Sequence, residues 1–128
     1  MEYLLDTHSF LWFINGDGQL SLKAKDSIAD PNSIKYISIA SLWEIAIKVN
    51  LGKLSLDMAY QDLRHHIIVN GFEILPITFE HTIELSSLEL LHRDPFDRII
   101  IAQALREKLT VISKDGNFIK YSELKLLW

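Results

Sequence analysis

Cysteine is absent from the sequence, and this absence excludes a disulfide framework, a thiolate zinc site and a cysteine nucleophile. No apolar run approaches the roughly 20 residues that a membrane-spanning helix needs. The N-terminus lacks the basic and then apolar pattern of a secretory signal, so we expect a cytoplasmic protein. The glycine-rich loops GxGxxG and GxxxxGKS/T are also missing, which excludes the usual nucleotide-binding motifs.

An excess of basic residues is missing too. The chain of 128 residues carries 13 Lys and Arg against 17 Asp and Glu, a formal net charge of −4. This balance argues against a broad basic surface for nucleic acid, but it does not exclude a small metal-charged pocket that acts on one. Apolar residues make up 48% of the sequence, which indicates a folded chain, and the length fits one domain over residues 1–128.

Short apolar runs alternate with segments of helical periodicity. The runs predict strands at 3–5, 34–39, 72–77 and 109–113, with a short fifth at 124–128. The periodic segments predict helices around 10–14, 22–29, 41–50, 56–68, 78–88 and 95–105. Because the strands are continuously apolar, we expect an α/β fold with a parallel sheet of four to five strands and helices on both faces.

Acidic residues stand where the strands of such a sheet end. Asp6 follows the first strand, Glu44 lies in the first helical turn after the second, and Asp115 follows the fourth. Asp97 lies in the first turn of the helix that leads into the fourth strand. Ligands of open α/β sheets bind outside the carboxyl ends of the strands, so these four side chains mark a candidate site.

Each acid taken alone also has a structural explanation. Ser41 and Glu44 have the spacing of a capping box, and Glu44 stands four residues before Lys48, an arrangement that stabilises a helix. Helix caps, turns or the positive end of a helix explain the others: Asp6, Asp94 with Pro95, Asp97, and Asp115 with Gly116. Capping alone does not require the acids to converge, and crowded carboxylates repel one another unless a cation lies between them.

Hard divalent cations are the natural partners of such a cluster. Mg²⁺ and Mn²⁺ bind oxygen ligands, and Mg²⁺ is commonly held by one or two carboxylates together with substrate phosphate. A metal in such a site polarises a phosphoryl oxygen and activates water. The acids therefore predict metal-assisted phosphodiester hydrolysis.

Four segments carry these acids in a fixed order. They are Leu4-Leu5-Asp6-Thr7-His8, Ser41-Leu42-Trp43-Glu44-Ile45-Ala46-Ile47-Lys48, His92-Arg93-Asp94-Pro95-Phe96-Asp97-Arg98 and Ser113-Lys114-Asp115-Gly116-Asn117-Phe118. Together with the apolar run 99–104, they closely resemble the PIN-domain ribonucleases of the VapC toxin type, over essentially the whole chain.

The resemblance implies a three-layer α/β/α fold and an endoribonuclease that depends on Mg²⁺ or Mn²⁺. The acidic quartet of the family, which is both catalytic and metal-binding, falls on Asp6, Glu44, Asp97 and Asp115. Thr7 would orient the first carboxylate, and Ser113 and Asn117 would support the fourth. Asp97 is preferred over Asp94 because the acid of the family directly precedes the apolar helix and Asp94 is already explained as a cap.

Basic and histidine side chains flank these acids. Arg93, Arg98 and Lys114 are candidates for contacts to RNA phosphates, although a solvated charge or an ion pair explains each of them equally well. His8 and His92 are poor candidates for metal ligands, because the chain has neither cysteine nor a His-x₃-His pattern.

Five consecutive apolar residues, 10–14, crowd one short predicted helix. Consecutive residues cannot all face one core, so part of the cluster faces a partner or the helix is buried on both sides. The resemblance implies a homodimer and a cognate VapB-like antitoxin that blocks the site.

Two other functions compete with the toxin ribonuclease. One is a PIN-domain nuclease of RNA processing that is not a toxin. The other is a receiver-like signalling domain with an acidic Mg²⁺ pocket. Receivers have adjacent acids after the first strand, whereas Asp6 here stands alone between Leu5 and Thr7.

Overall fold

The first apolar run of the sequence forms the central strand of a five-stranded sheet. In the computed structural model, which describes residues 1–128, β1 (Glu2–Leu5) pairs in parallel with β2 (Ile34–Ser38) on one side and β4 (Thr110–Ile112) on the other. The sheet ends in β3 (Phe72–Leu75) and β5 (Leu126–Leu127), and its strand order is β3-β2-β1-β4-β5. All four strand pairings are parallel, which confirms the prediction from the continuously apolar strands.

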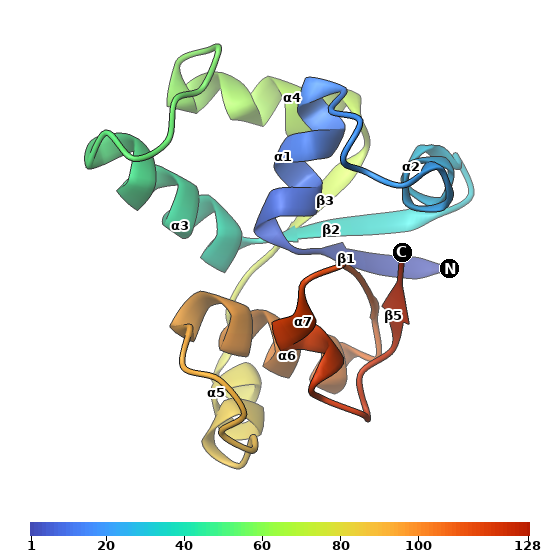
Figure 1. Cartoon of the computed structure of the whole chain (residues 1–128), viewed down its shortest axis with the longest axis vertical. Helices are drawn as coiled ribbons and strands as arrows, with labels where there is room; N and C mark the ends of the chain where they lie inside the picture. Colours follow the sequence, from blue (N-terminus) through green and yellow to red (C-terminus); the bar gives the residue numbers. More distant parts are fainter.

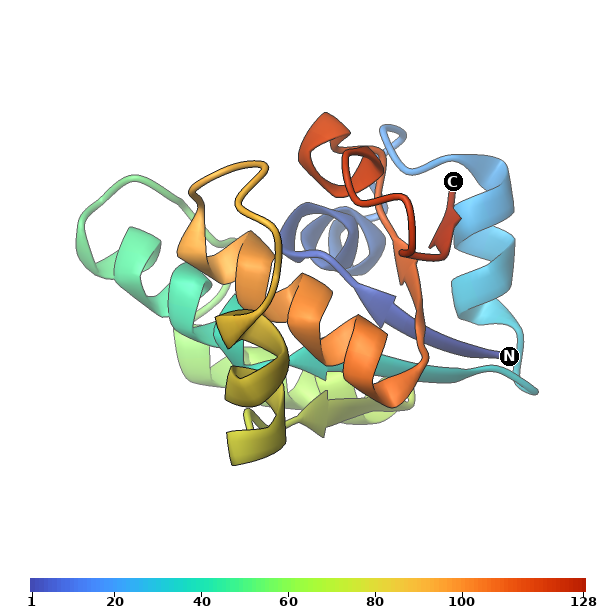
Figure 2. The same ribbon diagram turned by 90° about the horizontal axis from the view of Figure 1, so that it is seen from below.

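Helices cover both faces of this sheet. They are α1 (Thr7–Asn15), α2 (Leu22–Ala29), α3 (Ile39–Asn50), α4 (Leu63–Val69), α5 (Phe79–Ser86), α6 (Pro95–Glu107) and α7 (Gly116–Ile119), with one 3₁₀ turn, η1 (Tyr60–Asp62). Figure 1 shows α1 to α4 on one side of the sheet and α5 to α7 on the other. Figure 2, seen from below, shows α6 crossing in front of the strands. None of these helices combines the length and the apolar character that crossing a bilayer would require.

Two apolar cores lie on the opposite faces of the sheet. Successive side chains of a strand point to opposite faces, and β1 follows this rule. Tyr3 and Leu5 pack into the core that includes Phe10 of α1, whereas Leu4 packs into the core that includes Ile100 of α6 and Phe118 of α7. The fold is therefore a three-layer α/β/α arrangement.

The helix after β2 begins earlier than its sequence pattern predicts. Its N-cap is Ser38, whose side-chain oxygen accepts a hydrogen bond from the backbone N–H of Ala40 at 3.0 Å. The capping box proposed for Ser41 and Glu44 is therefore wrong, and Glu44 lies in the second turn of α3. The predicted pair with Lys48 is present, with Nζ 2.8 Å from the Glu44 carboxylate.

The helix predicted over 56–68 forms only in its second half. Leu56, Met58 and Tyr60 are half-buried and pack on the core, while the residues between them are exposed. This alternation is typical of an extended segment, which buries every second residue. The helix predicted for the first half of this stretch is therefore wrong. The chain becomes helical at η1 and continues into α4, which ends as predicted at Asn70 and Gly71.

Two smaller predictions have definite outcomes. Asp115 and Gly116, predicted as a turn, begin the short helix α7. The apolar cluster 10–14 packs within its own chain, because Phe10 is buried and Trp12 and Phe13 are half-buried against the same core. The cluster therefore packs on one core of its own chain, while Trp12 and Phe13 keep part of their surface exposed.

Candidate active site

Four acidic side chains come from four elements near the carboxyl ends of β1, β2 and β4. Leu5 pairs with both Ile37 and Ile112, so the ends of these three strands lie side by side. The acids are Asp6 and Asp115, the N-caps of α1 and α7, together with Glu44 in α3 and Asp97 in the first turn of α6. Each of the other three acids acts electrostatically on Asp97, so the structure brings the four predicted residues to one region.

Asp6 is buried and both of its carboxylate oxygens have donors. One oxygen accepts a hydrogen bond from the backbone N–H of Ser9 at 2.8 Å, which caps α1. The other accepts from the hydroxyl of Ser113 at 2.6 Å. Burial raises the pKa of Asp6 above its ordinary value, while these two hydrogen bonds lower it. Asp6 is thus a helix cap whose carboxyl group is held in place at the site.

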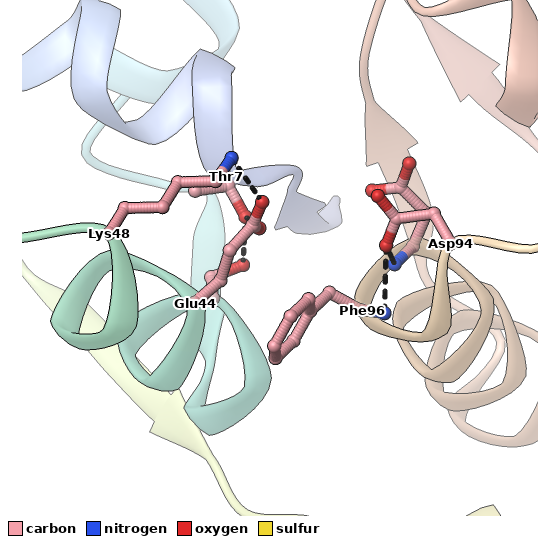
Figure 3. Close-up of polar contacts among 7 residues, drawn as sticks. Thr7, Glu44, Lys48, Asp94 and Phe96 are labelled. Carbon is pink, nitrogen blue, oxygen red and sulfur yellow. Dashed lines mark hydrogen bonds and ion pairs between the residues drawn. The ribbon is translucent and has the colours of Figure 1, made fainter. Parts of the chain in front are cut away.

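Glu44 is held by a chain of polar contacts, which Figure 3 shows. The Thr7 hydroxyl lies 2.7 Å from the Glu44 carboxylate and 2.9 Å from the Ser41 hydroxyl. Because a carboxylate only accepts, Thr7 donates to Glu44 and the Ser41 hydroxyl donates to Thr7. Lys48 binds the second carboxylate oxygen at 2.8 Å. Thr7 therefore positions Glu44. The family resemblance implies that Thr7 orients Asp6, and the structure does not show this contact.

Asp94 and Asp97, only three residues apart, have different environments. Asp94 caps α6, because its carboxylate accepts from the backbone N–H groups of Phe96 at 2.9 Å and Asp97 at 3.1 Å (Figure 3). The Asp97 carboxylate has no hydrogen-bond donor within the chain. Burial and, to a smaller extent, the nearby carboxylates together raise the pKa of Asp97 to about 7, and Asp94 contributes most among these carboxylates.

Ser113 connects the first and the fourth acid. Its oxygen donates to Asp6 and accepts from the backbone N–H of Asp115 at 3.0 Å. Asp115 in turn accepts from the backbone N–H of Asn117 at 2.9 Å. The Asn117 side chain points elsewhere and accepts from Lys120 at 3.4 Å. Support for Asp115 thus comes from the Asn117 backbone N–H, which every residue type except proline can supply.

The donor set fits a hard divalent cation in its chemistry. Carboxylate oxygens are the ligands that such a cation prefers, and the charges of the nearby acids add to burial in raising the pKa of Asp97. As the side chains stand, no three acidic or histidine side chains are close enough to share one ion. The reason is visible in the contacts: Asp6 is bound to Ser113, and Glu44 is bound to Thr7 and Lys48.

The flanking basic residues differ in their accessibility. Arg98 donates to the carbonyl of Leu88 at 3.0 Å and is half-buried, so it braces the segment before α6. Arg93 and Lys114 are exposed. His92 is half-buried, and burial lowers its pKa, while its Nδ1 accepts from the backbone N–H of Asp94 at 3.3 Å.

Ser41 and Lys48 belong to the candidate site although the sequence did not assign them to it. Their contribution depends on the contact between α1 and α3, since Thr7 lies 34 residues before Ser41. Nothing in the local pattern around Ser41 indicates this contact. The short spacing between Glu44 and Lys48 was a usable signal, because it predicts an ion pair on the same helix face.

The fold and the carboxylate cluster define an α/β domain with acidic side chains gathered near the carboxyl edge of its parallel sheet. The chain belongs to the PIN domain family, whose model matches residues 3–124. Members of this family are generally nucleases that use divalent metal ions. Membership gives no support to a receiver-like domain. A search of curated protein sequences finds no significant match.

Solved structures share the fold at low sequence identity. The chain is similar to VapBC2 from Rickettsia felis bound to a promoter DNA fragment, with a TM-score of 0.76, 20% identity and coverage of 99% of this chain and 98% of that one. For VapBC-1 from nontypeable Haemophilus influenzae the TM-score is 0.70, the identity 18% and the coverage 99% and 97%. For FitAcB from Neisseria gonorrhoeae these values are 0.61, 19%, and 98% and 96%.

Proposed function

We propose that this protein is an endoribonuclease that depends on Mg²⁺ or Mn²⁺ and serves as the toxin of a toxin–antitoxin pair. The observation that carries the proposal is the convergence of four carboxylates, Asp6, Glu44, Asp97 and Asp115, at one edge of a PIN-family sheet. Helix capping alone does not require carboxylates from four elements to lie in one region. The nearby acids help to raise the pKa of Asp97, and a bound cation would offset their repulsion.

The four carboxylates would hold the cation. When bound, it supplies positive charge for the phosphate and makes water more acidic. The residues of the chain have separate tasks. Ser113 holds Asp6, and Thr7 holds Glu44, in the free protein, and both carboxylates would have to shift from these contacts to share one cation. Hydrolysis forms a bond between a water oxygen and phosphorus and breaks the bond to the 3′ oxygen, leaving a 5′-phosphate and a 3′-hydroxyl.

The exposed basic side chains bind substrate in this proposal. Arg93 and Lys114 are free to contact RNA phosphates beside the carboxylates. Arg98 contributes indirectly, because its guanidinium is held by Leu88. Its role is to fix the start of α6 and therefore the position of Asp97.

Paired substitutions of Asp94 and Asp97 test the active site. Asp97→Asn should abolish cleavage of single-stranded RNA, whereas Asp94→Asn should retain it, because Asn caps a helix about as well as Asp. Cleavage is followed on gels with added Mg²⁺ or Mn²⁺ and with a chelator as control. Full activity of Asp97→Asn, or cleavage that persists in the chelator, would contradict the assignment.

The toxin role draws its support from the structural neighbours, which are VapBC and FitAB complexes. We expect expression of the chain alone to arrest growth, expression of Asp97→Asn to leave growth unchanged, and a cognate VapB-like protein to restore growth. The chain is expected to act in the cytoplasm as a homodimer, which light scattering of the purified protein can test. Normal growth despite RNA cleavage in vitro would instead indicate a PIN nuclease of RNA processing.

A further inference from the structure

A pocket opens beside two of the four carboxylates. Its volume is about 370 Å³, and its lining residues are Asp6, His8, Trp12, Gln19, Lys114 and Asp115. Asp6 and Asp115 form its inner side, so whatever enters it lies next to the proposed reaction centre. The remaining four side chains have no part in the carboxylate contacts described above.

Aromatic rings form one wall of this pocket. His8 and Trp12 stand four residues apart on α1, and their ring centroids are 5.8 Å apart with an angle of 36° between the planes. Trp128, at the end of β5, meets Trp12 edge to face at 6.0 Å. Trp12 is half-buried and His8 is exposed, so the wall keeps aromatic surface in contact with solvent.

Lys114 supplies a cation over these rings. Its ammonium lies 4.9 Å from the ring centroid of Trp12 and 5.8 Å from that of Trp128. It forms no ion pair, although Asp115 is its neighbour in the chain; Lys48 is the only lysine with one. An exposed ammonium that is not neutralised by a carboxylate is available for a phosphate.

We infer that this pocket binds one nucleotide of single-stranded RNA next to the phosphate that is cleaved, an inference that rests on the proposed function. The base stacks on Trp12, taking the place that the Lys114 ammonium holds in the free protein. Lys114 then binds the phosphate of the same nucleotide. The Gln19 amide, which can both donate and accept, meets the edge of the base.

The chemistry of the lining favours a nucleotide over a peptide. Aromatic faces bind bases of any sequence by stacking, and lysine binds phosphate as a point charge. Trp12 is the one apolar side chain of the lining, which gives an apolar helix from a protein partner little surface to bury. The volume is at the small end for ligand pockets, about 300–1,000 Å³, as a single nucleotide requires.

The binding test uses an Asp97→Asn background, so that RNA is not cleaved, and a short single-stranded oligoribonucleotide as probe. Trp12→Leu and Lys114→Met should each weaken binding about tenfold, whereas Trp12→Phe should stay within about twofold. Lys114→Met should also reduce the slope of log Kd against log salt by about 0.7, the value for one phosphate contact. Lys53→Ala, which removes a lysine remote from the pocket, is the matched control and should leave both quantities unchanged.

A scan with abasic nucleotides tests the stacking itself. Removing the base at one position of the probe should weaken binding to the protein with Trp12 intact, and the same removal should cost nothing in Trp12→Leu. Gln19→Ala should change the preference among bases at that position only. Because Gln19 and Lys114 are exposed, their variants remain informative even if Trp12→Leu folds poorly.

The outcomes separate this inference from the proposed function. RNA cleavage with unchanged KM and Kd in Trp12→Leu and Lys114→Met overturns the pocket and leaves the nuclease intact. If the pocket variants weaken probe binding as expected but the wild-type chain does not cleave RNA, the result supports the pocket and contradicts the nuclease. Unchanged RNA binding with weakened binding of the cognate antitoxin assigns the pocket to a peptide, and it overturns the inference.

Discussion

At the scale of single residues, the carboxylates of the site differ most in the donors around them. Asp6 and Glu44 each accept hydrogen bonds from hydroxyl groups within the chain, which stabilise their ionised forms. Asp97 has no donor, and its burial, followed by the charges of the nearby acids, raises its pKa to about 7. Burial raises the pKa of Asp6 as well, so ionisation is unfavourable at both Asp6 and Asp97 in the site without a cation.

Asp97→Asn should stabilise the metal-free protein, and only at higher pH. The unfolded carboxyl loses its proton near pH 3.8, whereas the folded one keeps it until about pH 7, so the stability of the wild type falls as pH rises through this window. At pH 8 the variant should gain about 2 kcal/mol, half of the full linkage value because solvent screens a partly exposed group. Urea unfolding in a chelator at pH 4 and pH 8 measures the difference, and an equal effect at both pH values would contradict the cause given.

Thr7 offers a second prediction at this scale. Thr7→Val removes the hydroxyl that donates to Glu44 and leaves a buried carboxylate oxygen without its donor, at a cost of about 1–3 kcal/mol in unfolding free energy. Thr7→Ser keeps the donor and should restore most of the stability and activity. Equal losses in both variants would mean that Thr7 acts through its methyl group and not through its hydroxyl.

At the scale of secondary structure, the start of α3 decides where Glu44 lies. Ser38 both caps the helix and bonds to Gln103 of α6 at 2.5 Å, so one hydroxyl joins the two helices that carry Glu44 and Asp97. The relative placement of the two carboxylates thus depends on a serine that lies outside the four motif segments.

Ser38→Ala should therefore cost more than the loss of an ordinary cap. A cap alone contributes about 1 kcal/mol, and the unpaired oxygen of the Gln103 amide adds about 1 kcal/mol. Ser41→Ala removes a buried hydrogen bond to Thr7 but no cap, and it serves as the comparison. Thermal unfolding of the two variants measures the difference, and an equal or larger effect of Ser41→Ala would contradict the additional role of the Ser38 cap.

Most elements, and the sheet edge that carries the acids, follow from sequence pattern. Strands and helix caps such as Asp94 depend mainly on residues that are close in sequence, so apolar periodicity and residue type predict them. The extended stretch around Leu56 could not be distinguished from a helix, because both bury residues spaced four apart. The contact of Thr7 with Glu44 joins residues 37 apart and depends on how α1 packs against α3, which no local pattern encodes.

At the scale of the whole molecule, a bound cation should stabilise the fold against unfolding. Ligands that bind only the folded state add about 2.7 kcal/mol at a concentration one hundred times their Kd. We expect Mg²⁺ or Mn²⁺ to raise the Tm of the wild type at pH 8 and to raise that of Asp97→Asn much less. Calorimetry with Ca²⁺ and with a monovalent salt of equal ionic strength controls for screening. An equal rise in both proteins would place the cation elsewhere.

The central position of β1 has a consequence for synthesis. β1 is the first strand to leave the ribosome, but its neighbours β2 and β4 are synthesised later. Ser113, the hydrogen-bond partner of Asp6, follows 107 residues after it. A growing chain that has exposed Asp6 and Glu44 still lacks the helix with Asp97 and the strand that precedes Asp115. The cluster is complete only when synthesis is nearly finished, so, on the proposed function, a nascent chain lacks the full set of carboxylates that RNA cleavage would require.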